Sequence, residues 1–154
     1  MNFKQKFIMF IATGFYTGKT GFAPGTFGTI AAIPFALLFL VIPAYLHAVY
    51  ITVLILAAIY FADNAEKIIN KKDPGCIVID EIAGYVVALS IVPVNIQTLT
   101  AGFFIFRFFD IIKLPPVKYF ENNFSGGAGI VLDDIMAGLL TALTLKIIYL
   151  SGIF

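Results

Sequence analysis

Charged residues are absent from two long stretches of the chain, and these stretches define its predicted architecture. No charge occurs in the 43 residues from Thr20 to Ala62 or in the 25 residues from Ile82 to Phe106. A helix that crosses a bilayer needs about 20 predominantly apolar residues. The pattern therefore predicts an all-helical, multi-pass membrane protein with two or more crossings.

Proline and glycine divide the apolar sequence into separate helices. A glycine-rich loop is expected over residues 13–28, and Asp73-Pro74-Gly75 is expected to turn the chain. Several of the expected helices are short for a crossing, and short helices can be tilted or broken around a polar cavity. The ranges expected to be helical are 3–12, 30–41, 47–70, 80–92, 98–113 and 130–149.

The composition agrees with a membrane protein and argues against several other classes. Hydrophobic residues make up 60% of the 154 residues, whereas a soluble domain contains roughly 45–50%. Ten Lys and Arg nearly balance nine Asp and Glu, so no charge excess attracts nucleic acid. The single cysteine, Cys76, excludes an internal disulfide. We expect one domain over residues 1–154, with the N-terminal helix retained because no small-residue cleavage site follows it.

Five acidic residues occur inside apolar sequence, where an unpaired charge is costly. They are the pair Asp80 and Glu81, the single residue Asp110, and the pair Asp133 and Asp134. At about 2.5–3.5 kcal/mol each near a bilayer centre, their total cost is comparable to the stability of a whole domain. They must therefore be paired, hydrated or bound to metal. Alternatively, they mark helix ends at the membrane surface, where the macrodipole favours acids in the first turn.

The two acid pairs lie in similar sequences. Residues 77–84 read IVIDEIAG and residues 130–138 read IVLDDIMAG, with a small residue three or four positions after an acid in both. On a helix this spacing places the small residue on the same face as the acid, where it lets another helix pack closely. Two such helices packed together would bring four carboxylates together. Hard oxygen ligands of this kind suit Mg²⁺, which is usually held by one or two carboxylates plus substrate phosphate.

Basic residues accompany the third acid. Arg107, Asp110 and Lys113 are spaced three residues apart and are therefore neighbours along a helix. One interpretation is an intramembrane ladder of ion pairs. The other is a phosphate clamp, in which Asp110 orients Arg107 and the planar guanidinium binds two phosphate oxygens. Acids for a metal next to cations for a phosphate indicate phosphoryl chemistry, with water as the attacking group.

Other phosphoryl-transfer motifs are incomplete in this chain. Residues 14–20 resemble a P-loop, but three residues separate the glycines where four are needed. The only histidine, His47, lies in apolar sequence, and the residue six positions after Cys76 is Ile82 rather than arginine. Two other classes stay open: an ion-coupled carrier or channel, because intramembrane acids also form ion paths, and a structural membrane protein.

Four segments, in this order, resemble the phosphatidylglycerophosphatase A family. They are residues 21–29 (GFAPGTFGT), residues 77–84, residues 102–113 (GFFIFRFFDIIK) and residues 126–138. The resemblance implies a bacterial, Mg²⁺-dependent, multi-pass membrane enzyme with an all-helical core. Its implied reaction removes the terminal phosphate from a phospholipid substrate, phosphatidylglycerophosphate, and gives phosphatidylglycerol.

One departure from the family pattern concerns the residues after the clamp. The family typically continues from the lysine as Lys-Pro-x-Pro, whereas this chain reads Lys113-Leu114-Pro115-Pro116. The helix is therefore expected to extend one residue further.

The lysines at 67, 71, 72 and 118 flank the loops next to the acid pairs. Short lysine-rich loops stay inside the cell, so the site is expected on the cytoplasmic side.

The expected site combines the acids, the cations and the hydroxyls of the glycine-rich loop. Thr26 and Thr29 can donate hydroxyls to a phosphate or can simply cap the following helix. The expected catalytic residues are Asp80, Glu81, Asp110 and Asp134. The expected substrate-binding residues are Thr26, Thr29, Arg107 and Lys113. The expected Mg²⁺ ligands are Asp80, Glu81, Asp133 and Asp134.

Overall fold

The computed structural model describes residues 1–153, with the side chains of residues 121 and 122 left aside, and over this range it is helical throughout, without a strand. This confirms the predicted all-helical class. The α-helices are α1 (Phe3–Ala12), α2 (Pro24–Ala31), α3 (Ile33–Leu37), α4 (His47–Ile69), α5 (Ile79–Ala88), α6 (Ile96–Ile112), α7 (Val117–Asn123) and α8 (Gly126–Leu150). Short 3-10 turns cover Thr17–Lys19, Leu38–Leu40 and Ala44–Leu46.

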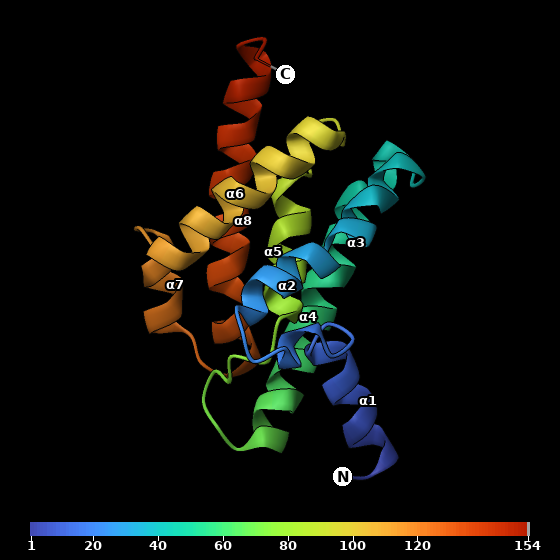
Figure 1. Ribbon diagram of the computed structural model, residues 1–154, viewed down its shortest axis with the longest axis vertical. Helices are drawn as coiled ribbons and strands as arrows, with labels where there is room; N and C mark the ends of the chain where they lie inside the picture. Colours follow the sequence, from blue (N-terminus) through green and yellow to red (C-terminus); the bar gives the residue numbers. More distant parts are fainter. Residues whose placement is uncertain (154) are drawn as a thin grey trace.

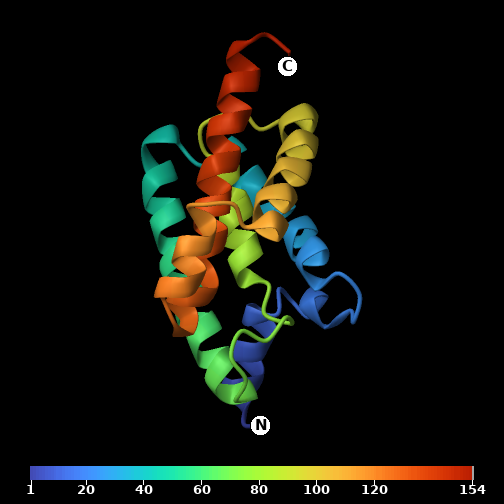
Figure 2. The same ribbon diagram turned by 90° about the vertical axis from the view of Figure 1, so that its left-hand side faces the viewer.

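The short helix α5 is the centre of the molecule, and α2, α3, α4, α6 and α8 pack around it (Figures 1 and 2). Nine of its ten residues are buried. Apart from two acids in its first turn, its sequence is apolar or small on every side, and such a helix is stable only when it is enclosed. The Val78 N–H donates to the Ala12 carbonyl at 3.0 Å, and the Tyr85 hydroxyl donates to the Leu99 carbonyl at 2.6 Å. These bonds fix α5 to the end of α1 and to α6.

Two glycines bring the backbones of α5 and α8 into direct contact. A Cβ atom on Gly84 would lie 2.6 Å from the carbonyl oxygen of Asp134, and a Cβ atom on Gly138 would overlap the carbonyl oxygen of Gly84. These are the small residues of the two similar segments. Their predicted role in close helix packing is therefore confirmed.

Two helical segments are long and apolar enough to cross a membrane, Ala44–Ile69 and Gly126–Leu150. Few residues of the first are fully buried, most being half-buried or exposed, whereas half of the second is buried inside the protein. Each presents a row of exposed apolar side chains at helical spacing. These are Val49, Val53, Leu56 and Tyr60 on α4, and Leu139, Leu143, Ile147 and Leu150 on α8. Rows of exposed apolar side chains along a long helix are expected where lipid replaces water.

The structure corrects several predicted boundaries. The loop expected over residues 13–28 ends at Ala23, because Pro24 begins α2 at a position where its missing N–H costs no hydrogen bond. The helix expected over residues 30–41 is broken into α3 and a 3-10 turn, and α7 was not expected. Helix α8 begins at Gly126 rather than at residue 130. Glycine has low helix propensity, so tertiary packing rather than local preference makes these glycine-containing segments helical.

Because of the contact at Gly138, we expect a glycine to alanine change there to lower the stability of the protein. Inside a helix this change normally stabilises by about 1 kcal/mol, but here the new methyl group would collide with the backbone of α5. We expect Gly138→Ala to destabilise the protein by about 1–3 kcal/mol, measured as a fall of several degrees in Tm in detergent. Gly75→Ala is the matched control, because a Cβ atom there meets nothing within 4 Å. Equal Tm values for the two variants would contradict the close contact.

Candidate functional site

A polar cavity of about 350 Å³ lies at the N-terminal end of α5. It is lined by residues of α2, α5, α6 and α8, of the segment before α2 and of the turn before α5. Seven of the nine site residues expected from the sequence line it. These are Asp80, Glu81, Arg107, Asp110, Lys113, Asp133 and Asp134.

Three of the acids converge on one point of the cavity. One carboxylate oxygen from each of Asp80, Glu81 and Asp134 lies within 4.8 Å of the others. Asp80 is 9% exposed and Asp134 is 3% exposed. One oxygen of each of the three carboxylates is buried without a hydrogen-bond partner among the residues that the structure describes. Buried unpaired carboxylate oxygens are costly, and this donor set fits a divalent cation with oxygen ligands.

Two neighbouring acids, Asp80 and Glu81, lie at the start of α5, outside both candidate spans. Burial is the main cause that raises the pKa of Asp80 well above its ordinary value, and the neighbouring Glu81 carboxylate adds to it. Burial also raises the pKa of Glu81. Both acids lie in the first turn of α5, where the helix macrodipole favours negative charge. The two carboxyl groups are thus close together and largely buried.

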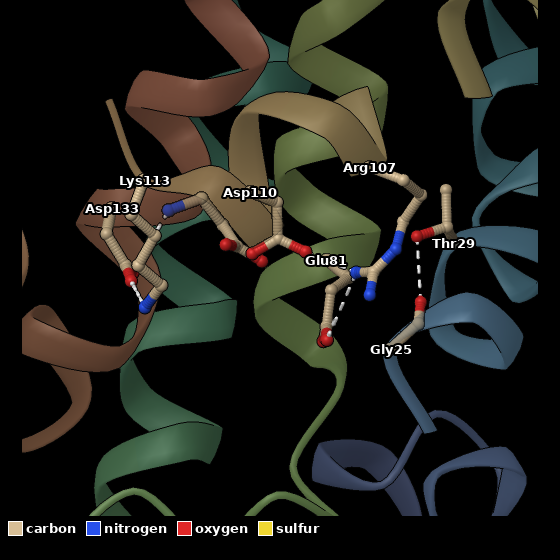
Figure 3. Close-up of polar contacts among 8 residues, drawn as sticks. Gly25, Thr29, Glu81, Arg107, Asp110, Lys113 and Asp133 are labelled. Carbon is tan, nitrogen blue, oxygen red and sulfur yellow. Dashed lines mark hydrogen bonds and ion pairs between the residues drawn. The ribbon is translucent and has the colours of Figure 1, made fainter. Parts of the chain in front are cut away.

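Asp133 is turned away from this cluster. Its Oδ2 accepts a hydrogen bond from Lys113 Nζ at 2.8 Å, and its Oδ1 accepts one from the Asp134 N–H at 3.0 Å (Figure 3). Asp133 can pair with Lys113 because of the position at which α6 ends. Lys113 is the left-handed C-cap, with φ of 49°, so the helix stops at Ile112 instead of extending to residue 113 as expected. Lys113 therefore does not continue the row of Arg107 and Asp110, and it pairs with α8.

Arg107 makes the ion pair that its spacing predicts. Its Nη1 donates to the carboxylate of Asp110 and lies 3.8 Å from Oε1 of Glu81 (Figure 3). The side chains of Arg107 and Asp110 are 17% and 13% exposed. The Nε of Arg107 is buried and has no partner among the described residues. Two carboxylates thus orient the guanidinium and leave other donors available to a ligand.

Gly25 allows α2 to approach this guanidinium. A Cβ atom on Gly25 would lie 2.7 Å from Arg107 Nη1 and would overlap Oε1 of Glu81. Any larger residue would displace one of these two side chains. The sequence marked this segment as rich in glycine, but it gave no sign that Gly25 faces Glu81 and Arg107, which lie 56 and 82 positions further along the chain.

The two threonines of the same segment are not brought into the cavity. The Thr29 hydroxyl is fully buried and donates to the Gly25 carbonyl at 2.8 Å within α2 (Figure 3). Thr26 is half-buried and its N–H donates to the Ala23 carbonyl at 3.0 Å. Threonine in a helix commonly bonds the carbonyl four residues earlier. In this structure Thr29 stabilises the turn that carries Gly25, and direct contact of either threonine with a substrate stays a prediction.

Comparison with known proteins gives one family. A family model described as Phosphatidylglycerophosphatase A matches residues 10–149. Phosphatidylglycerophosphatase A of Escherichia coli (strain K12) is 38% identical over 143 residues, which cover 92% of this chain and 81% of the relative. Phosphatidylglycerophosphatase A of Haemophilus influenzae is 31% identical over 134 residues, which cover 86% of this chain and 82% of the relative.

A third relative carries a different name. The putative phosphatidylinositol-3-phosphatase of Bacteroides thetaiotaomicron is 34% identical over 145 residues, which cover 89% of this chain and 90% of the relative. No solved structure matches the chain significantly. The relatives are thus named after phosphatases that act on two different phospholipid headgroups.

Proposed function

The chain belongs to the phosphatidylglycerophosphatase A family, and we propose that it hydrolyses the terminal phosphate of phosphatidylglycerophosphate to give phosphatidylglycerol. One observation carries this proposal: Asp80, Glu81 and Asp134 converge in the same cavity as the Arg107 guanidinium. Carboxylates suit a metal ion, and a planar guanidinium suits the oxygens of a phosphate. The names of two relatives support the lipid substrate.

We propose Asp80, Glu81 and Asp134 as ligands of Mg²⁺. When bound, the ion would supply Lewis-acid stabilisation of the charge on the phosphate oxygens. The three unpartnered carboxylate oxygens support this proposal. Asp133 was expected as a fourth ligand, but its oxygens are occupied by Lys113 and by the Asp134 N–H. Its role in this proposal is to orient Asp134 and to neutralise part of the charge with Lys113.

The protein's own residues supply the remaining requirements of hydrolysis. The reaction forms a bond from a water oxygen to phosphorus and breaks the bond from phosphorus to the glycerol oxygen. The proton of the attacking water passes to one of the four acids that we propose as catalytic, Asp80, Glu81, Asp110 or Asp134, and the departing glycerol oxygen takes up a proton. Arg107, held by Asp110 and Glu81, donates to the phosphate oxygens as negative charge develops.

The ion-coupled carrier is disfavoured by the same geometry. A path for cations would have to pass Arg107 and Lys113, which line the cavity together with the acids. Positive charge at these positions repels a cation and attracts a phosphate. Membership of a phosphatase family agrees with the enzymatic alternative.

We propose that the protein resides in the bacterial cytoplasmic membrane with the cavity open to the cytoplasmic side. Lys67, Lys71 and Lys72 lie at the end of one candidate span, and short lysine-rich loops stay inside. In a Cys76→Ser background, a cysteine at Lys71 should react with a membrane-impermeant maleimide in inverted vesicles and stay unlabelled in intact cells. Labelling from outside intact cells would contradict this orientation.

Phosphate release from defined lipids tests the function and the metal ligands together. With Mg²⁺ present, the wild-type protein should hydrolyse phosphatidylglycerophosphate in preference to phosphatidic acid and phosphatidylinositol 3-phosphate. Asp80→Asn and Asp134→Asn should each lose at least about a hundredfold in kcat/KM, because several kcal/mol of electrostatic stabilisation disappear. Chelation of the metal should have the same effect on the wild-type protein.

Asp63→Asn is the control for these variants. Asp63 lies on α4 outside the cavity, and asparagine keeps an oxygen to accept the Gly127 N–H. It should retain activity within a factor of about two. Near-wild-type turnover in both Asp80→Asn and Asp134→Asn would contradict their assignment as metal ligands. A preference for phosphatidylinositol 3-phosphate would contradict phosphatidylglycerophosphate as the substrate.

Arg107→Lys separates a phosphate clamp from a structural ion pair. Lysine keeps the charge but loses the planar fork, so a clamp predicts a sharp fall in kcat with little change in Tm. A structural pair predicts instead that Arg107→Lys keeps its activity, because lysine would still neutralise Asp110. In that case Arg107→Ala would strand the carboxylate at a cost of roughly 3–5 kcal/mol. An active Arg107→Lys enzyme beside an unfolded Arg107→Ala variant would therefore rule out the clamp.

A further inference from the structure

The residues that line the cavity are of two chemical kinds. Pro24 of α2 and Ile111 of α6 are apolar, and Ile111 is 68% exposed at the protein surface. Asp73 and the ion pair of Lys113 with Asp133 are charged. A phospholipid has the same division, since its acyl chains need an apolar surface and its headgroup needs water or polar partners.

On α6 the apolar side continues as an exposed row. Phe104, Phe108 and Ile111 are 67%, 50% and 68% exposed, and their spacing of four and three residues places them on one face of the helix. Arg107 lies within one turn of all three residues. The exposed apolar face of α6 therefore ends at the guanidinium.

A second apolar row begins just before α2 and continues along it. Phe22, directly before the N-cap of α2, is 78% exposed, and Phe27 and Ile30 are 39% and 46% exposed. Phe27 follows Pro24 by three residues and Ile30 follows Phe27 by three, so each is a neighbour of the next along the helix. Arg107 extends from α6 toward Gly25 of α2 (Figure 3). The guanidinium therefore lies between α2 and α6.

We propose that the lipid reaches the cavity from the bilayer between α2 and α6, with its acyl chains against the apolar rows of these two helices. The phosphate monoester would then pass Arg107 before it meets the acids. This inference rests on the proposed function, because it assumes a phospholipid substrate. Continuity with the cavity through Pro24 and Ile111 selects these rows, since none of the exposed apolar residues of α4 or α8 lines the cavity.

The test compares a long-chain lipid with a short-chain analogue that needs no membrane. Phe22→Gln and Phe108→Gln alter the two rows without changing a residue that lines the cavity. Phe3→Gln and Phe7→Gln are matched controls on α1, because these phenylalanines are 86% and 50% exposed. Phosphate release is measured for dioleoyl phosphatidylglycerophosphate in mixed micelles at varied mole fraction. It is also measured for dissolved dibutanoyl phosphatidylglycerophosphate, with Mg²⁺ in both assays.

The access path predicts a selective change in apparent KM. For the dioleoyl lipid, KM should rise at least tenfold in Phe22→Gln and Phe108→Gln with kcat within a factor of two, and it should change less than twofold in the α1 controls. All four variants should hydrolyse the dibutanoyl lipid like the wild type. Equal increases in the control variants, or equal losses on both lipids, would overturn the path. A wild-type protein that hydrolyses neither lipid would overturn the proposed function, and the path with it.

Discussion

The backbone contact between α5 and α8 is the constraint on which the cavity depends. Gly84 and Gly138 each follow an acid by four residues, Asp80 on α5 and Asp134 on α8. Because a residue and its fourth neighbour share one helix face, the contact between the glycines brings the two acids to the same place one turn away. Side chains at the glycine positions would separate the helices, and the carboxylates of Asp80 and Asp134 would no longer converge.

The charges around this contact are only partly balanced by the protein. Two cations, Arg107 and Lys113, face six acids that line the cavity. Lys113 is engaged with Asp133, and Arg107 is engaged with Asp110 and Glu81. Among the residues that the structure describes, the buried oxygens without a partner are on the three convergent acids. Unsatisfied charge of this kind is costly, and it is typical of reaction centres.

The surroundings of the cavity fit a substrate with one apolar and one charged end. Exposed aromatic and aliphatic side chains of α2 and α6 lie near it, and the turn that contains Asp73 contributes to its polar lining. The two candidate spans, α4 and α8, present further exposed apolar side chains that do not line the cavity.

Local patterns in the sequence determined the helical class, most of α1 and α4, the close packing of the two acid-containing segments and the pairing of Arg107 with Asp110. Each depends on residues within about one turn, or on a composition that only a helix in an apolar setting tolerates. Tertiary structure alone decided that Asp133 pairs with Lys113, that Gly25 faces Arg107, and that Pro24–Ala31 is helical. The reason is that a helix end and the partner of a buried charge depend on distances across the fold, and helical periodicity carries no information about those distances.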